Sequence, residues 1–224
     1  MRPSLHAALS LIAHKGGGLI DIMNQHLKTR LTEVQILDIF LGVTDALTHM
    51  HALSPKILHR DLKIENILRS TGSTYKLCDF GSATLLPHPL KLNSVDEIKR
   101  LEAEFNKVTT IQYRSPEMLD LYQWRYIDEK CDIWALGVLL YKLCYYTTPF
   151  ENGQGGVNSL AILNAQYSIP TYPLYSSSLN TLISSMLRQA PRDRPSAVEI
   201  LKRVHQMRGT MNEFRVGCLT PFEV

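Results

Sequence analysis

The feature that most constrains the fold is a long apolar segment at residues 133–146. Lys142 is the only charged residue in it. A helix that is apolar around its whole circumference belongs inside a core, because none of its faces suits water. The segment is also shorter than the roughly 20 residues that a helix needs to cross a bilayer. We therefore predict a buried central helix in a globular protein.

Sequence signals for helix ends mark two further helices. Thr32 and Gln35 form a capping box, in which each side chain bonds the backbone of the other residue. Ser196 and Glu199 repeat this pattern later in the chain. Apolar residues three and four positions apart also predict a helix within the long connection at residues 82–110. Most of the chain is therefore expected to be helical.

Short apolar runs at residues 57–58, 67–68 and 75–77 are separated by polar turns, such as the one at residues 70–73. Runs of this kind predict short strands that flank loops. Together with the helices they predict a mainly α, α+β fold, with a small strand-and-loop element inserted after the first long helix.

Composition narrows the class of protein. The chain has 224 residues, of which 45% are hydrophobic and 20% charged, as expected for a globular domain. Its net charge of +3 comes without a concentrated basic patch, so we expect no nucleic-acid partner. The four cysteines lie far apart without a C-x-x-C pair, which predicts reduced thiols. No apolar run is long enough for a transmembrane segment, and we expect a cytoplasmic protein.

Residues suited to phosphate chemistry cluster in two neighbouring segments. Asp61, Asn66 and Asp79 offer oxygen atoms that can bind a metal or accept a proton, and Lys63 adds a positive charge beside Asp61. Mg²⁺ prefers a few protein oxygens and completes its shell with phosphate and water. Phosphoryl transfer needs a positioned hydroxyl, a base and positive charge over the transferred group. These residue types therefore favour phosphoryl transfer.

Residues 59–66, His-Arg-Asp-Leu-Lys-Ile-Glu-Asn, resemble the catalytic loop of protein kinases, and Asp79-Phe80-Gly81 resembles their metal-binding D-F-G element. Residues 115–117 resemble the A-P-E element with Ser in place of Ala. Residues 132–137 resemble the start of the central helix of the kinase C-terminal lobe, and residues 191–195 the segment whose Arg pairs with the A-P-E Glu. The five motifs occur in the kinase order.

This resemblance implies a protein-kinase-like C-terminal lobe over residues 15–208, with a small β element at the catalytic loop. The sequence before Lys15 does not resemble the strand that precedes this point in kinases, so residues 1–14 are expected to lie outside the lobe, and residues 209–224 would form a C-terminal tail. A complete kinase also needs a Gly-rich loop and a strand Lys. Neither motif occurs in the 58 residues before His59, so the N-terminal lobe is expected to be missing.

The sequence also resembles one particular family of protein kinases. Five further segments are similar to the Numb-associated kinase family: residues 16–24, 95–107, 109–114, 118–122 and 140–144. This family includes fungal actin-regulating kinases and animal adaptor-associated and cyclin-G-associated kinases. The resemblance implies transfer of phosphate to Ser and especially Thr of protein substrates, namely endocytic adaptors and actin-patch proteins. It also implies a location at cortical actin and endocytic sites.

The same resemblance assigns roles to single residues. Asp61 would orient the substrate hydroxyl and accept its proton, and Lys63 would neutralise the γ-phosphate. Asn66 would act with them in catalysis and, with Asp79, hold Mg²⁺. Leu68 would lie under the adenine. The residues expected to bind the cofactors, ATP and Mg²⁺, are Lys63, Glu65, Asn66, Leu68 and Asp79.

Further residues would support the site. Thr110 would hydrogen-bond near Asp61 and Lys63, Glu117 and Arg194 would form a structural ion pair, and Asp132 would brace the catalytic loop. We also hypothesise that Arg60 pairs with a phosphate on Ser94 or Thr109 and so orders the segment around them.

Two functional hypotheses remain open. In the first, the chain is a shortened form of an active Ser/Thr kinase. In the second, it is a catalytically inactive, kinase-derived binding module. The retention of Asp61, Lys63, Asn66 and Asp79 favours the first, because a lobe released from catalysis has no chemical need for all four.

Overall fold

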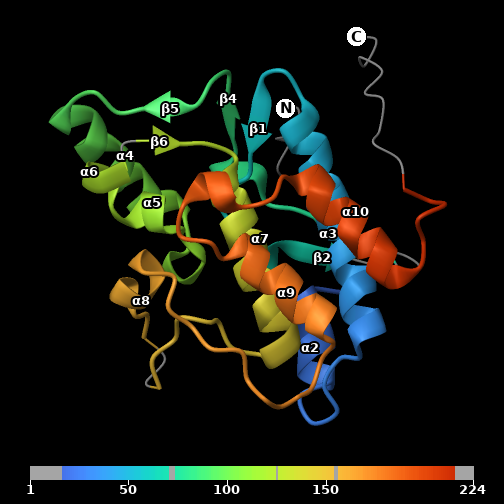
Figure 1. Cartoon of the computed structure of the whole chain (residues 1–224). Coiled ribbons are helices and arrows are strands. Elements are labelled where there is room, and N and C mark those ends of the chain that lie inside the picture. Colours follow the sequence, from blue (N-terminus) through green and yellow to red (C-terminus); the bar gives the residue numbers. More distant parts are fainter. Residues whose placement is uncertain (1–16, 71–73, 125, 154–155, 215–224) are drawn as a thin grey trace, which may run out of the picture.

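The computed structural model describes residues 17–70, 74–124, 126–153 and 156–214. The expected domain boundary at residue 14 and most of the expected C-terminal tail lie outside these residues. The architecture is mainly helical α+β with small antiparallel sheets (Figure 1). The helices are α2 (Leu19–Gln25), α3 (Glu33–Ala52), α4 (Val95–Val108), α5 (Pro116–Leu119), α6 (Leu121–Trp124), α7 (Lys130–Tyr145), α8 (Ser159–Leu163), α9 (Ser177–Met186) and α10 (Ala197–Arg208).

The strands pair two by two among the residues that the structure describes. Strand β1 (Lys56–Leu58) pairs with β4 (Thr84–Leu86), β2 (Ile67–Arg69) with β3 (Tyr75–Leu77), and β5 (Leu90–Lys91) with β6 (Tyr126–Ile127). Short 3₁₀ turns complete the fold: η1 (Ile64–Asn66), η2 (Phe80–Ser82), η3 (Ile111–Tyr113) and η4 (Pro191–Asp193). The predicted strands at residues 57–58, 67–68 and 75–77 are confirmed.

Helix α7 lies at the centre of the molecule, as its sequence predicts (Figure 1). Nearly every residue of it is buried, and the indole of Trp134 stacks on the ring of Phe150 at 5.3 Å between centroids. The helix begins at Lys130, three residues before the apolar segment, and ends where Tyr146 takes a left-handed conformation (φ 65°). Helices α3 and α9 pack against it.

Helix α3 packs along α10 and across β3. Its predicted capping box is present, since the Thr32 hydroxyl accepts from the Gln35 amide at 3.3 Å and the Gln35 carboxamide accepts from the Thr32 amide at 2.8 Å. Gly42 allows the close approach to β3, because a Cβ atom there would lie 2.6 Å from the carbonyl oxygen of Tyr75. The capping box at Ser196 and Glu199 likewise opens α10.

Helix α4 confirms the helix predicted within residues 82–110. Ser94 caps its start and accepts from the Glu97 amide at 3.2 Å. The apolar face of α4 enters a second hydrophobic cluster, separate from the main core around α3, α7, α9 and α10. The members of this cluster are Leu58, Leu86, Leu92, Ile98, Leu101, Phe105, Met118, Leu121, Ile127 and Cys131.

The predicted ion pair between Glu117 and Arg194 joins α5 to η4. Two parallel hydrogen bonds of 2.7 and 2.8 Å connect the guanidinium to the carboxylate, and both side chains are almost fully buried. The guanidinium also lies over the Trp134 ring of α7, 5.0 Å from its centroid. This ion pair therefore fixes α5 and η4 to the central helix.

The three cysteines within the described part of the chain, Cys78, Cys131 and Cys144, are free thiols. No helix among the same residues has the length and apolar character needed to cross a membrane.

Candidate active site

The site is built from two loops that the small sheets hold together. Residues 59–66 run from β1 to β2, and residues 78–83 run from β3 to β4. Because β1 pairs with β4 and β2 with β3, both ends of each loop are tied to the other loop. Cys78 donates its amide to the Asn66 carbonyl at 2.9 Å, and a His59 ring nitrogen lies 3.1 Å from the Cys78 carbonyl oxygen.

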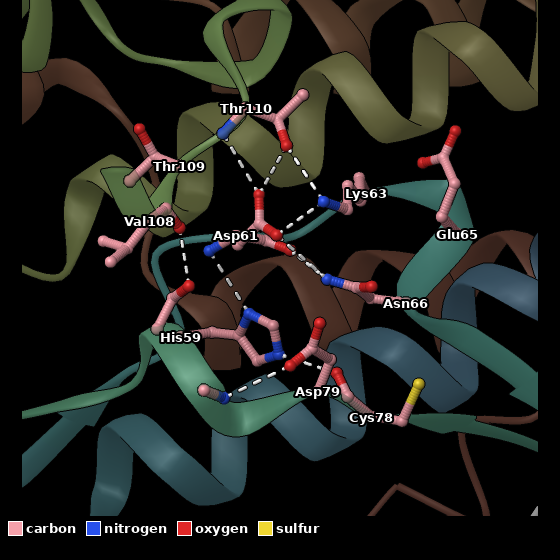
Figure 2. Close-up of polar contacts among 12 residues, drawn as sticks. His59, Asp61, Lys63, Glu65, Asn66, Cys78, Asp79, Val108, Thr109 and Thr110 are labelled. Atoms are coloured by element: carbon pink, nitrogen blue, oxygen red, sulfur yellow. Dashed lines mark hydrogen bonds and ion pairs between the residues drawn. The ribbon is translucent and has the colours of Figure 1, made fainter. Parts of the chain in front are cut away.

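The carboxylate of Asp61 is the centre of the polar contacts (Figure 2). Its Oδ1 accepts from the Thr110 amide at 3.1 Å and from the Thr110 hydroxyl at 2.7 Å. Its Oδ2 lies 2.7 Å from Lys63 Nζ and 3.2 Å from Asn66 Nδ2. The Thr110 hydroxyl in turn accepts from Lys63 Nζ at 3.0 Å. The structure thus brings Asp61, Lys63, Asn66 and Thr110 into one cluster, and the expected place of Thr110 is confirmed.

Asp132, in the first turn of α7, braces the loop that carries Asp61. Its carboxylate accepts from the backbone amides of His59 and Arg60, each at 2.8 Å, and Oδ2 also lies 3.0 Å from His51 Nε2. Burial by itself would raise the pKa of Asp132, but the bond from His51 and the nearby His59 outweigh it and hold the pKa below 3.8. An ionised carboxylate therefore anchors the loop, as the sequence predicts. Arg60 adopts a left-handed backbone there (φ 67°).

Asp79 follows β3 and takes a left-handed conformation with φ 61° and ψ 72°. Its Oδ1 accepts from the Gly81 amide at 3.3 Å, and the residue is exposed. No ion pair to Asp79 occurs among the residues that the structure describes. Its carboxylate is therefore available to a ligand from solvent.

The donor atoms suit Mg²⁺. Asn66 turns its Nδ2 to the Asp61 carbonyl and carboxylate, at 2.8 and 3.2 Å, which leaves its Oδ1 on the opposite side of the amide. The described residues contain no group of three or more His, Cys, Asp or Glu that could hold a metal without help. One amide oxygen and one exposed carboxylate match a cation that takes its remaining ligands from phosphate and water.

Besides Asp79, two of the expected nucleotide-site residues lie outside the cluster of Asp61, Lys63, Asn66 and Thr110. Glu65 points away from Asp61 in Figure 2, and its carboxylate lies 3.8 Å from Lys142 Nζ on α7. Leu68 is half-buried on β2 and pairs with Lys76 on β3 and, through a bridge, with Gly18. Their roles toward ATP stay predictions.

The sequence did not reveal several contacts that hold the site. Ser82 donates its hydroxyl to the Val108 carbonyl at 2.5 Å, and Arg60 donates to the Ser82 carbonyl at 2.6 Å. Arg60 also pairs with Glu104 at 2.6 Å, so its side chain has a carboxylate partner within the chain. The partners lie far apart in sequence and share no spacing that a pattern could detect.

The motifs, their order and this geometry are those of a protein kinase domain. Residues 4–205 match the family model of the protein kinase domain, and the chain belongs to the protein kinase family.

Its relatives confirm the narrower resemblance. Over 191 residues the chain is 51% identical to actin-regulating kinase 1 of Saccharomyces cerevisiae, an alignment that covers 85% of this chain and 29% of that protein. It is 50% identical over 196 residues to serine/threonine-protein kinase ppk30 of Schizosaccharomyces pombe, covering 87% and 20%. Actin-regulating kinase PRK1 of Saccharomyces cerevisiae is 48% identical over 192 residues, covering 85% and 23%. The chain spans less than a third of the length of these three relatives.

Proposed function

We propose that this chain carries the catalytic residues of a serine/threonine protein kinase, which transfers the γ-phosphoryl group of ATP to Ser or Thr of a protein. The observation that supports this most is the Asp61 carboxylate, fixed by Thr110 on one side and by Lys63 and Asn66 on the other. A carboxylate beside an ammonium group supplies both a proton acceptor and a positive charge, which are what phosphoryl transfer requires.

In the proposed reaction the substrate hydroxyl oxygen attacks the γ-phosphorus. A bond forms between these two atoms, the bond from the γ-phosphorus to the β,γ-bridging oxygen breaks, and ADP leaves. Asp61 orients the hydroxyl and accepts its proton. Lys63, which already touches both Asp61 and Thr110, stabilises the negative charge on the transferred group.

Asn66 and Asp79 would hold Mg²⁺ through their side-chain oxygens. The ion supplies positive charge over the phosphate oxygens and orients them when it is bound. Glu65 and Leu68 complete the proposed nucleotide site, with Leu68 under the adenine.

The proposed substrates are proteins that control actin and endocytosis, at cortical actin in the cytoplasm. Two relatives at about half identity are actin-regulating kinases, which supports the actin part of this proposal. A Thr acceptor is preferred, as the resemblance to the Numb-associated kinases implies.

The test is transfer of the γ-phosphoryl group from ATP to a Thr-containing peptide, with and without Mg²⁺. We expect Mg²⁺-dependent transfer, and we expect Asp79→Asn to reduce it by about 100-fold or more, since a metal oxygen ligand is lost. Asp45→Asn, an exposed carboxylate on α3, is the matched control and should leave the rate unchanged. If neither the wild type nor either variant transfers phosphate to the peptide, the proposal is overturned in favour of the binding-module hypothesis.

A further inference from the structure

Helix α4 leads directly into the residue that contacts Asp61. The helix ends at Val108, Thr109 is its C-cap, and Thr110 follows immediately. The amide and the hydroxyl of Thr110 both donate to the Asp61 carboxylate. Whatever fixes the C-terminal end of α4 therefore also fixes Thr110 against the proposed catalytic base.

A buried arginine clamps this end of the helix. Arg114 donates to the Asn106 side chain at 2.7 Å, to the Thr109 hydroxyl at 2.6 Å, and to the carbonyl oxygens of Phe105 and Thr109 at 2.9 and 3.2 Å. The last carbonyl groups of a helix have no partner within it and attract positive charge. Burial lowers the pKa of Arg114, yet a guanidinium remains charged at neutral pH.

A second arginine ties the same helix to the catalytic loop. Arg60 precedes Asp61, and its side chain is only 10% exposed. It donates to the Ser82 carbonyl at 2.6 Å and to the Glu104 carboxylate of α4 at 2.6 Å. Ser82 in turn donates to the carbonyl oxygen of Val108 at 2.5 Å. The catalytic loop, the loop after Asp79 and the end of α4 are thus joined through one guanidinium.

Kinase activation segments are commonly ordered by phosphorylation, because a new phosphate pairs with arginine. Here the two hydroxyls considered for that role are already engaged. Ser94 caps α4, and Thr109 donates to the Phe105 carbonyl while it accepts from Arg114. The negative charge at Arg60 comes instead from Glu104.

We propose that Glu104 is a positioning residue: it holds Arg60 and the end of α4 together so that Thr110 stays on Asp61 and Lys63 without any phosphate in the chain. The inference rests on the proposed function for its effect on catalysis. It replaces the hypothesis that a phosphate on Ser94 or Thr109 orders this segment.

The test compares Glu104→Gln, which keeps the shape but removes the charge, with Glu102→Gln on the same helix. The described structure gives Glu102 no ion pair. For Glu104→Gln we expect kcat to fall about fivefold with an unchanged KM for ATP. We also expect amide hydrogen exchange at residues 105–113 to accelerate about fivefold. Both changes are modest because the ion pair that is lost is half-exposed. Glu102→Gln should change neither quantity.

Two further experiments test whether the effect depends on a phosphate and on the contact between Arg60 and Glu104. Phosphatase treatment should leave the wild-type kcat unchanged. Arg60→Gln combined with Glu104→Gln should be no slower than Arg60→Gln alone, because the second change removes a contact already lost. A wild-type chain inactivated by phosphatase, or a Glu104→Gln chain with wild-type exchange and kcat, would overturn the inference. If the wild type transfers no phosphate at all, the proposed function fails, and amide exchange alone decides whether Glu104 holds the segment.

Discussion

At the scale of single residues, the structure depends on buried charges that have bonded partners. Arg194 forms an ion pair with Glu117 of α5. The carboxylate of Asp132 accepts hydrogen bonds from two backbone amides and lies within hydrogen-bond distance of His51. An isolated charge in such places would be strongly destabilising, whereas a fully bonded pair mainly fixes one arrangement of the chain. These residues therefore fix α5, η4 and the loop at residues 59–66 to α7.

Removing Arg194 tests this view. Arg194→Ala leaves the Glu117 carboxylate buried and unpaired, so we expect the free energy of unfolding to fall by about 3–5 kcal/mol. Arg192→Ala in the same turn is the control, because its side chain is 89% exposed and its loss should change stability by less than about 0.5 kcal/mol. Urea unfolding measures both values. Equal losses for the two variants would contradict the assignment.

The Asp132 carboxylate predicts a pH dependence. Its pKa in the folded protein lies below the ordinary value of 3.8, so its ionised form stabilises the fold fully above that pH. The contribution is lost as the pH falls through the lower, folded-state pKa. We therefore expect the stability difference between the wild type and Asp132→Asn to shrink as the pH falls from about 5 to about 3. Unfolding midpoints across this range would show it, and a difference that grew toward acid pH would refute it.

At the scale of elements, sequence patterns identified what is local. The capping boxes of α3 and α10, the apolar circumference of α7 and the spacing within α4 each depend on neighbouring residues. Strands β4, β5 and β6 were not predicted, because elements of two or three residues carry too little periodicity. Their existence depends on partners from distant parts of the chain.

The contact of α3 with β3 gives a test at this scale. Alanine at position 42 would favour the helix by up to about 1 kcal/mol through propensity alone. Its Cβ would lie 2.6 Å from the Tyr75 carbonyl oxygen, so we expect Gly42→Ala instead to destabilise the protein by about 1–3 kcal/mol. A Cβ at Gly153 would meet nothing within 4 Å, and Gly153→Ala is the control for thermal unfolding. A stabilised Gly42→Ala variant would disprove the close packing.

At the scale of the whole molecule, the site assembles from segments far apart in the chain. Asp61, Lys63, Asn66 and Asp79 could be named from their motifs, and Thr110 and Asp132 from the same resemblance. The contacts of Arg60 with Glu104 and of Arg114 with the end of α4 could not, because they exist only once α4 packs on its cluster. Motifs thus predicted the residues of the candidate site, and packing determined how they are held in place.

The most direct measurement of the central claim is the kcat for phosphoryl transfer to a Thr peptide by the wild type and by Asp61→Asn. The amide keeps the size of the side chain but cannot accept the hydroxyl proton. We predict a decrease in kcat of about 10²- to 10⁴-fold with little change in ATP affinity. A variant that transfers phosphate at the wild-type rate would contradict the role of Asp61 and with it the proposed function.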